Sequence, residues 1–131
     1  MSKTILVVDD DPSILSIFEF ILKQAGHKTH VALSGDEAIK LVKSDIPFDL
    51  AFLDVKMPGM SGIETYRNFQ QICPMLLVVM MTGYSVDELL KEAFELGAYG
   101  VIYKPFDIEE VLSVVDKIFK VSSPTSNPTP S

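Results

Sequence analysis

Ile5-Leu6-Val7-Val8-Asp9-Asp10-Asp11 is the stretch that decides the fold, because an apolar run ends there in three carboxylates. A second run, Leu50-Ala51-Phe52-Leu53, ends in Asp54, and two later runs end in Thr82 and in Lys104-Pro105. The carboxyl ends of parallel strands meet at one edge of a sheet. If these four runs are such strands, that edge gathers acids, a hydroxyl and an amine.

Grouped carboxylates repel one another. Two of them held about 4 Å apart repel by roughly 4 kcal/mol at an effective dielectric near 20, so the cluster requires a cation. A set of oxygen ligands without histidine or thiolate favours a hard ion such as Mg²⁺ or Ca²⁺ over zinc. Because Mg²⁺ commonly accompanies phosphate, we predict a Mg²⁺ site with phosphate chemistry.

Strand-like and helix-like segments alternate five times. The expected strands are residues 5–8, 27–32, 49–53, 75–81 and 100–103. The expected helices follow the capping residues Asp11, Ser34, Ser61, Ser85 and Asp107, and Gly26 and Gly97 end the first and the fourth of them. Five βα units predict an α/β fold with a doubly wound, five-stranded parallel sheet and five helices.

Size and composition fit one domain, residues 1–121. The chain has 131 residues, and 18 acidic against 11 basic side chains give a net charge of −7, which argues against direct nucleic-acid binding by this domain. The longest apolar stretch, residues 75–81, is too short to cross a membrane, and no signal sequence precedes the first strand. We therefore expect a cytoplasmic protein without a membrane association.

The last ten residues differ from the rest. Residues 122–131 consist of Ser, Thr, Pro and one Asn, with no apolar side chain to bury, so we expect a disordered tail or linker. A segment of this composition either ends a protein or tethers a further domain, and both alternatives stay open.

In order and placement, the acidic run, Asp54, Thr82 and Lys104-Pro105-Phe106 resemble the receiver domain of two-component response regulators, of the CheY-like type. The resemblance covers residues 4–120. It implies a flavodoxin-like sheet of strand order 2-1-3-4-5.

The resemblance also implies roles for single residues. Asp54 is the expected phosphoacceptor. Asp10 and Asp54 are expected to bind Mg²⁺ directly together with the backbone carbonyl of Lys56, whereas Asp9 would act mainly through water. Thr82 and Lys104 would contact the phosphoryl oxygens, and the peptide bond after Lys104 is expected to be cis.

The chemistry requires these residue types. Attack of a carboxylate on a phosphoryl group brings two anions together, so positive charge from Mg²⁺ and Lys104 has to surround the transferring oxygens. The expected phosphoryl donor is a histidine kinase or a phosphotransfer protein. We expect a switch rather than an enzyme, with only self-phosphorylation and self-dephosphorylation chemistry.

Phosphorylation is expected to draw in Thr82 and the loop at Tyr84. This movement would change the surface made by the helix after residue 85, the strand 100–103 and the final helix. The surface would control a C-terminal output domain, a separate target protein or a phosphorylation-dependent dimer. Lys56 and Tyr84 are expected to shield the phosphoryl group from water.

One position departs from the family pattern. Many receivers have an aromatic switch residue three positions before the lysine, and this chain has Val101 there. Tyr103 has the same strand parity as Val101 and is our candidate substitute.

Three other functions are less consistent with the sequence. A haloacid dehalogenase-like enzyme would need an acid where Lys56 stands, and an FMN-binding flavodoxin would need a hydroxyl-rich loop in place of Asp10-Asp11-Pro12. A degenerate receiver that only docks partners would not need the complete set of site residues.

Overall fold

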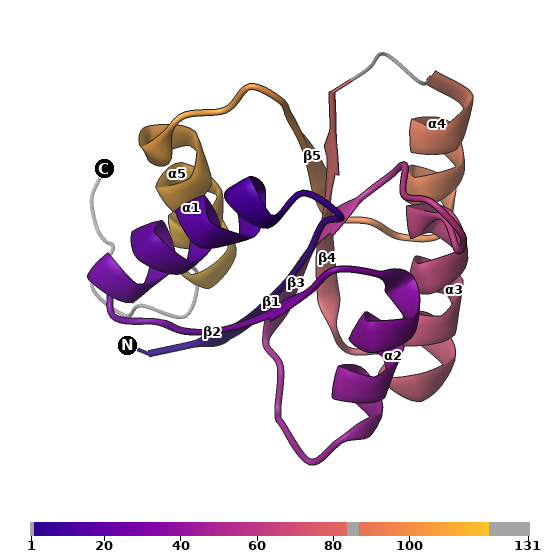
Figure 1. Cartoon of the computed structure of the whole chain (residues 1–131), viewed down its shortest axis with the longest axis horizontal. Coiled ribbons are helices and arrows are strands. Elements are labelled where there is room, and N and C mark those ends of the chain that lie inside the picture. Colours follow the sequence, from indigo (N-terminus) through magenta and orange to yellow (C-terminus); the bar gives the residue numbers. More distant parts are fainter. Residues whose placement is uncertain (1, 84–86, 121–131) are drawn as a thin grey trace.

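The computed structural model describes residues 2–83 and 87–120. Its centre is a five-stranded sheet of order β2-β1-β3-β4-β5, in which every neighbouring pair is parallel (Figure 1). The strands are β1 (Thr4–Val8), β2 (Lys28–Ala32), β3 (Leu50–Asp54), β4 (Leu77–Thr82) and β5 (Gly100–Tyr103). The predicted flavodoxin-like order is confirmed.

Five helices cover the two faces of the sheet. They are α1 (Pro12–Gln24), α2 (Gly35–Lys43), α3 (Gly62–Ile72), α4 (Asp87–Glu95) and α5 (Ile108–Lys120). Helices α1 and α5 lie on one face, and α2, α3 and α4 lie on the other (Figure 1). Residues 122–131 and the proposed α4 cap Ser85 lie outside the described residues.

The central strands are buried on both faces, so alternate side chains enter two separate cores. In β3, Leu50 and Phe52 pack with α1 and α5, whereas Ala51 and Leu53 pack with α2, α3 and α4. The ring of Phe18 in α1 lies 4.9 Å from that of Phe52 and 5.0 Å from that of Phe106. This aromatic cluster joins α1 to the loop that follows β5.

Helix starts agree with the predicted caps. The side chains of Asp11, Ser34, Ser61 and Asp107 each accept a hydrogen bond from a backbone N–H of the first helical turn. At Ser61 the bond is reciprocal, because the Glu64 side chain accepts from the Ser61 backbone N–H. These caps fix the residues at which the helices begin after the strands.

The fourth strand starts two residues later than we predicted. Met75 is 88% exposed and lies in a turn closed by a 3.0 Å hydrogen bond from the Leu76 N–H to the Cys73 carbonyl. Pro74 occupies the second position of this turn, which it favours because its φ is fixed. Apolar composition alone did not distinguish turn from strand.

Across residues 2–83 and 87–120, no helix combines the length and the apolar character needed to span a membrane.

Candidate functional site

The sheet register brings the predicted site residues together. Val8 of β1 pairs with Leu53 of β3, so the next residues, Asp9 and Asp54, emerge side by side. On the other side of β3, the Lys104 N–H donates a 2.7 Å hydrogen bond to the Thr82 carbonyl. Asp9, Asp54, Thr82 and Lys104 line one open cavity of about 1020 Å³ at the carboxyl edge of the sheet. Asp10 and Lys56 also line this cavity.

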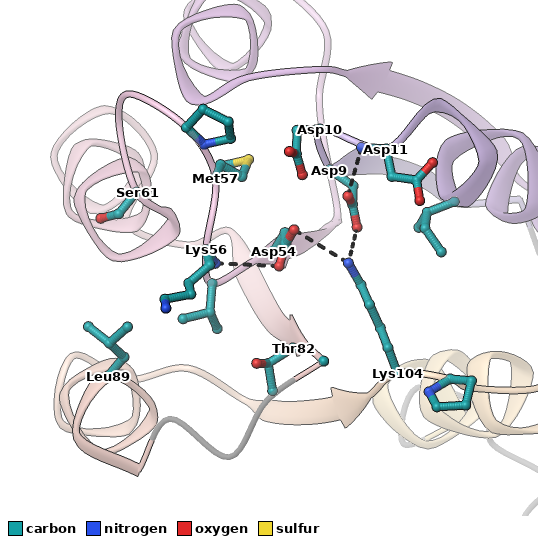
Figure 2. A pocket seen from close by; sticks show the side chains of 15 residues that line it. Asp9, Asp10, Asp11, Asp54, Lys56, Met57, Ser61, Thr82, Leu89 and Lys104 are labelled. Carbon is teal, nitrogen blue, oxygen red and sulfur yellow. Dashed lines mark hydrogen bonds and ion pairs between the residues drawn. The ribbon is translucent and has the colours of Figure 1, made fainter.

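Three carboxylates in this cavity form an acidic cluster, which we define as Asp9, Asp10 and Asp54. Each offers one oxygen, and the three oxygens lie within 4.8 Å of one another. Asp9 is completely buried and Asp54 is 5% exposed, whereas Asp10 is exposed at the mouth. Figure 2 shows the three side chains converging.

Lys104 reaches into the acidic cluster from the end of β5. Its Nζ lies 2.7 Å from Asp9 Oδ2 and 3.4 Å from Asp54 Oδ2 (Figure 2). Apart from this ion pair, Asp9 Oδ2 has no hydrogen-bond partner among the described residues. Lys104 therefore supplies the cation that grouped acids require when no metal ion is bound.

The surroundings of Asp54 change its protonation. Burial raises the pKa of Asp54 and the neighbouring Asp9 charge raises it further, so that it reaches about 6 although Lys104 acts in the opposite direction. Burial by itself lowers the pKa of Lys104, but the hydrogen bond to Asp9 and the charges of both acids raise it above the ordinary value. The protonation of Asp54 is thus sensitive to local charge near neutral pH.

Two further predicted residues lie at the same cavity. Thr82 ends β4 and is 1% exposed. The Lys56 backbone N–H donates a 3.4 Å hydrogen bond to Asp54 Oδ1, and the Lys56 side chain points away from Asp54 in Figure 2. The Lys104-Pro105 peptide bond is cis, as we expected.

Comparison with known proteins agrees with this geometry. Residues 5–116 match the family described as "Response regulator receiver domain". The chain belongs to the response regulator receiver domain family. It is thus a receiver domain of the two-component type, with a phosphoacceptor signalling role.

Individual relatives show the same relationship. This receiver domain is 36% identical over 123 residues to sporulation initiation phosphotransferase F of Bacillus subtilis, covering 94% of this chain and 98% of that protein. It is 36% identical over 111 residues to the DNA-binding transcriptional regulator NtrC of Klebsiella pneumoniae, covering 85% of this chain but only 24% of that protein. A solved CheY-like receiver structure from Methanospirillum hungatei superposes with a TM-score of 0.87 at 29% identity, covering 92% of this chain and 96% of that one.

The acidic cluster of this receiver domain fits a divalent cation. An octahedral ion with bonds of about 2.1 Å holds its ligand atoms about 3 to 4 Å apart, close to the 4.8 Å limit within which the three oxygens lie. The donors are all carboxylate oxygens, which hard cations prefer. The spacing and the donor chemistry of the cluster are therefore compatible with Mg²⁺.

The proposed switch residues lie apart from the cluster. Val101 is partly buried and packs against the core under α2, α3 and α4. Tyr103 is 52% exposed at the end of β5, where it pairs with Thr82 in the sheet register. Tyr84 lies outside the described residues.

Sequence reasoning missed one residue beside the site. Gly62, the first residue of α3, packs directly against the backbone of Asp54. The sequence pattern did not single it out, because a glycine follows a capping serine at Gly35 as well.

Proposed function

We propose that Asp54 is the phosphoacceptor of this receiver domain and that its phosphorylation depends on Mg²⁺. The observation that carries the proposal is the position of Asp54 within the acidic cluster. Asp54 faces Lys104 at 3.4 Å and receives a backbone hydrogen bond from Lys56, and unlike the completely buried Asp9 it is partly open to the cavity, at 5% exposure. A nucleophile and a fixed cation therefore share one cavity.

The metal site would use Asp10 and Asp54 as direct ligands, with the backbone carbonyl of Lys56 as a third ligand. Asp9, which is completely buried and paired with Lys104, would act mainly through water. When bound, Mg²⁺ supplies positive charge beside the transferring phosphoryl oxygens.

In the proposed reaction, a carboxylate oxygen of Asp54 forms a bond to phosphorus while the bond from phosphorus to the donor breaks. The donor atom, a histidine nitrogen of a kinase or phosphotransfer protein, keeps the bonding electron pair and takes a proton. Lys104 and the Thr82 hydroxyl would contact the phosphoryl oxygens. Loss of the phosphoryl group reverses the change at Asp54, with water as the attacking group.

The output would pass through α4, β5 and α5. Exposed aromatic side chains on this surface support the proposal, since Phe94 is 45%, Tyr99 49% and Tyr103 52% exposed. Aromatic residues are enriched where proteins bind partners. The partner would be an output domain linked through residues 122–131, a separate target or a second phosphorylated copy.

The comparisons support this range of partners. One relative named a phosphotransferase matches over nearly its whole length, and another named a DNA-binding regulator matches over 24% of its length. We propose a cytoplasmic location and a switch role, in which the chain catalyses only its own phosphorylation and dephosphorylation. DNA contact would belong to a linked domain and not to this acidic one.

The decisive experiment is incubation with acetyl phosphate and Mg²⁺, followed by intact mass measurement. We expect one added phosphoryl group in the wild type and in Asp45→Ala, a control that removes an exposed acid from the loop before β3. Asp54→Ala should show no adduct, and omission of Mg²⁺ should suppress it. An adduct that persists in Asp54→Ala would refute the proposal.

A further inference from the structure

The N-terminus of α3 lies against the main chain of Asp54. A side chain at Gly62 would place its first carbon 2.0 Å from the Asp54 carbonyl oxygen, and 2.9 Å from both the Asp54 carbonyl carbon and Val55 Cα. All three are backbone atoms, so no side-chain rotation can relieve the overlap. The close approach therefore depends on glycine at this position.

Backbone hydrogen bonds fix the same peptide segment from two sides. The Gly62 N–H donates to the Val55 carbonyl at 2.9 Å, and the Val55 N–H donates to the Met81 carbonyl of β4 at 2.9 Å. The segment that carries Asp54 is thus held between α3 and β4. The reciprocal cap of Ser61 and Glu64 holds the first turn of α3 in place.

We propose that Gly62 is a positioning residue for the phosphoacceptor. By allowing α3 to contact the Asp54 main chain, it fixes the direction in which the Asp54 carboxylate enters the cavity. The inference rests on the proposed function, in which Asp54 receives the phosphoryl group. Gly62 would affect the rate at which Asp54 is phosphorylated and not the choice of the phosphorylated residue.

Geometry sets the expected size of the effect. The Asp54 carboxylate has two separate partners, since Oδ1 accepts from the Lys56 N–H and Oδ2 faces the Lys104 ammonium, each at 3.4 Å. A methyl group at position 62 would force the Asp54 backbone or α3 to move. Misplacement of a reacting group by about 1 Å can slow a reaction roughly 100-fold.

The test compares Gly62→Ala with the wild type by the initial rate of phosphorylation from acetyl phosphate and Mg²⁺. Rates are measured by intact mass, far below the unfolding midpoint of each protein. We expect Gly62→Ala to be slowed by about tenfold or more, with its remaining adduct still on Asp54.

Leu22→Ala provides a destabilising control. Leu22 is completely buried near the C-terminal end of α1, and it belongs to the core on the opposite face of the sheet from α3. We expect Leu22→Ala to lower the unfolding midpoint while its phosphorylation rate stays at the wild-type value.

A second readout separates positioning from general loss of stability. The ¹³C signal of the Asp54 carboxyl group reports its surroundings in the fully folded protein. We expect its chemical shift to change in Gly62→Ala and to stay unchanged in Leu22→Ala. Equal effects of the two variants on this signal would overturn the inference.

The remaining outcomes are also informative. A folded Gly62→Ala protein with the wild-type rate would overturn the inference while leaving the proposed function intact, provided that Asp54→Ala abolishes the adduct. If Gly62→Ala does not fold, Ser61→Ala and Ser34→Ala replace it, since each serine accepts a 3.2 Å bond from the third helical residue. Slower phosphorylation in Ser61→Ala alone would support the role of the α3 start, and equal rates would refute it.

Discussion

The ammonium of Lys104 lies 2.7 Å from the buried Asp9 Oδ2, closer than the 3.4 Å that separates it from Asp54 Oδ2. Asp9 therefore holds the lysine in the cavity, and Asp54 receives only part of its charge. Burial and the neighbouring Asp9 charge raise the pKa of Asp54 by more than Lys104 lowers it. Of the two acids that face Lys104, Asp54 is thus the one more distant from its ammonium.

The first prediction concerns the stability of the metal-free protein. The pKa of Asp54 is about 6 in the folded state against 3.8 for an ordinary aspartate, so the folded state favours the protonated form. The contribution of Asp54 to the free energy of unfolding is fully present below pH 3.8, and it is lost as the pH rises to about 6. Asp54→Asn should therefore be more stable than the wild type at pH 7.5, by on the order of 2–3 kcal/mol.

Denaturant unfolding in EDTA from pH 4 to pH 8 checks this prediction. The difference between Asp54→Asn and the wild type should shrink as the pH falls toward 4. Asp45→Asn, which changes an exposed acid, should follow the wild type at every pH. An Asp54→Asn protein less stable than the wild type at pH 7.5 would contradict the account of the cluster.

The second prediction concerns metal binding. A ligand at 100 times its Kd stabilises the folded state by about 2.7 kcal/mol, which corresponds to an increase in Tm on the order of 5–15 °C in a domain of this size. We expect Mg²⁺ to give such an increase in the wild type. Asp10→Asn should lose most of it, because it removes an exposed ligand without disturbing the core.

Thermal unfolding with MgCl₂, and with NaCl at the same ionic strength, measures the effect. Sodium should raise the Tm much less than magnesium, because screening acts weakly on buried charges. An identical magnesium effect in the wild type and in Asp10→Asn would show that the cation binds elsewhere.

Residue order along the chain predicted a parallel sheet and the gathering of polar side chains at one edge, whereas the strand order came from the resemblance to receiver domains. Asp9, Asp54, Thr82 and Lys104 each follow an apolar run, and parallel pairing then leaves them one edge to share. The position of Lys104 between Asp9 and Asp54 could not be predicted, because it depends on side-chain distances. Gly62 was missed for a similar reason, since its importance lies in a close contact with the Asp54 backbone that only the packing of α3 creates.

The third prediction concerns the core beneath the site. Phe18 is completely buried between Phe52 and Phe106, and Phe106 follows directly after the cis peptide bond. Phe18→Ala should lower the free energy of unfolding by about 3–5 kcal/mol, because it removes a large side chain and leaves a cavity. Phe20→Ala, on the same helix but 61% exposed, should change it by less than about 0.5 kcal/mol. Denaturant unfolding compares the two variants. Similar losses of unfolding free energy would contradict the central position of Phe18 in the aromatic cluster.

The fourth prediction concerns the lifetime of the phosphorylated state. Lys56 borders Asp54, and its side chain points away from the carboxylate in Figure 2, so shielding requires the side chain to turn toward the phosphoryl group. The added negative charge would favour this rotation. Lys56→Asn should lose phosphate several-fold faster than the wild type, measured by intact mass after removal of acetyl phosphate. Lys40→Asn, on α2, serves as a control for the loss of one positive charge, and slower loss in Lys56→Asn would refute shielding.

The last prediction concerns the missing aromatic switch. Val101 already packs against the core under α4, which leaves Tyr103 as the aromatic side chain of β5 with freedom to move, since it is 52% exposed. If it replaces the usual switch residue, phosphorylation should bury it. Incorporation of 3-fluorotyrosine, with the signal of Tyr103 assigned through Tyr103→Phe, would detect this change by ¹⁹F NMR. We expect the Tyr103 signal to shift on addition of acetyl phosphate and Mg²⁺ and to remain unchanged in Asp54→Ala. Tyr103→Ala should lose the partner binding or dimerisation that phosphorylation induces in the wild type. Retained binding in this variant would exclude Tyr103 as the switch.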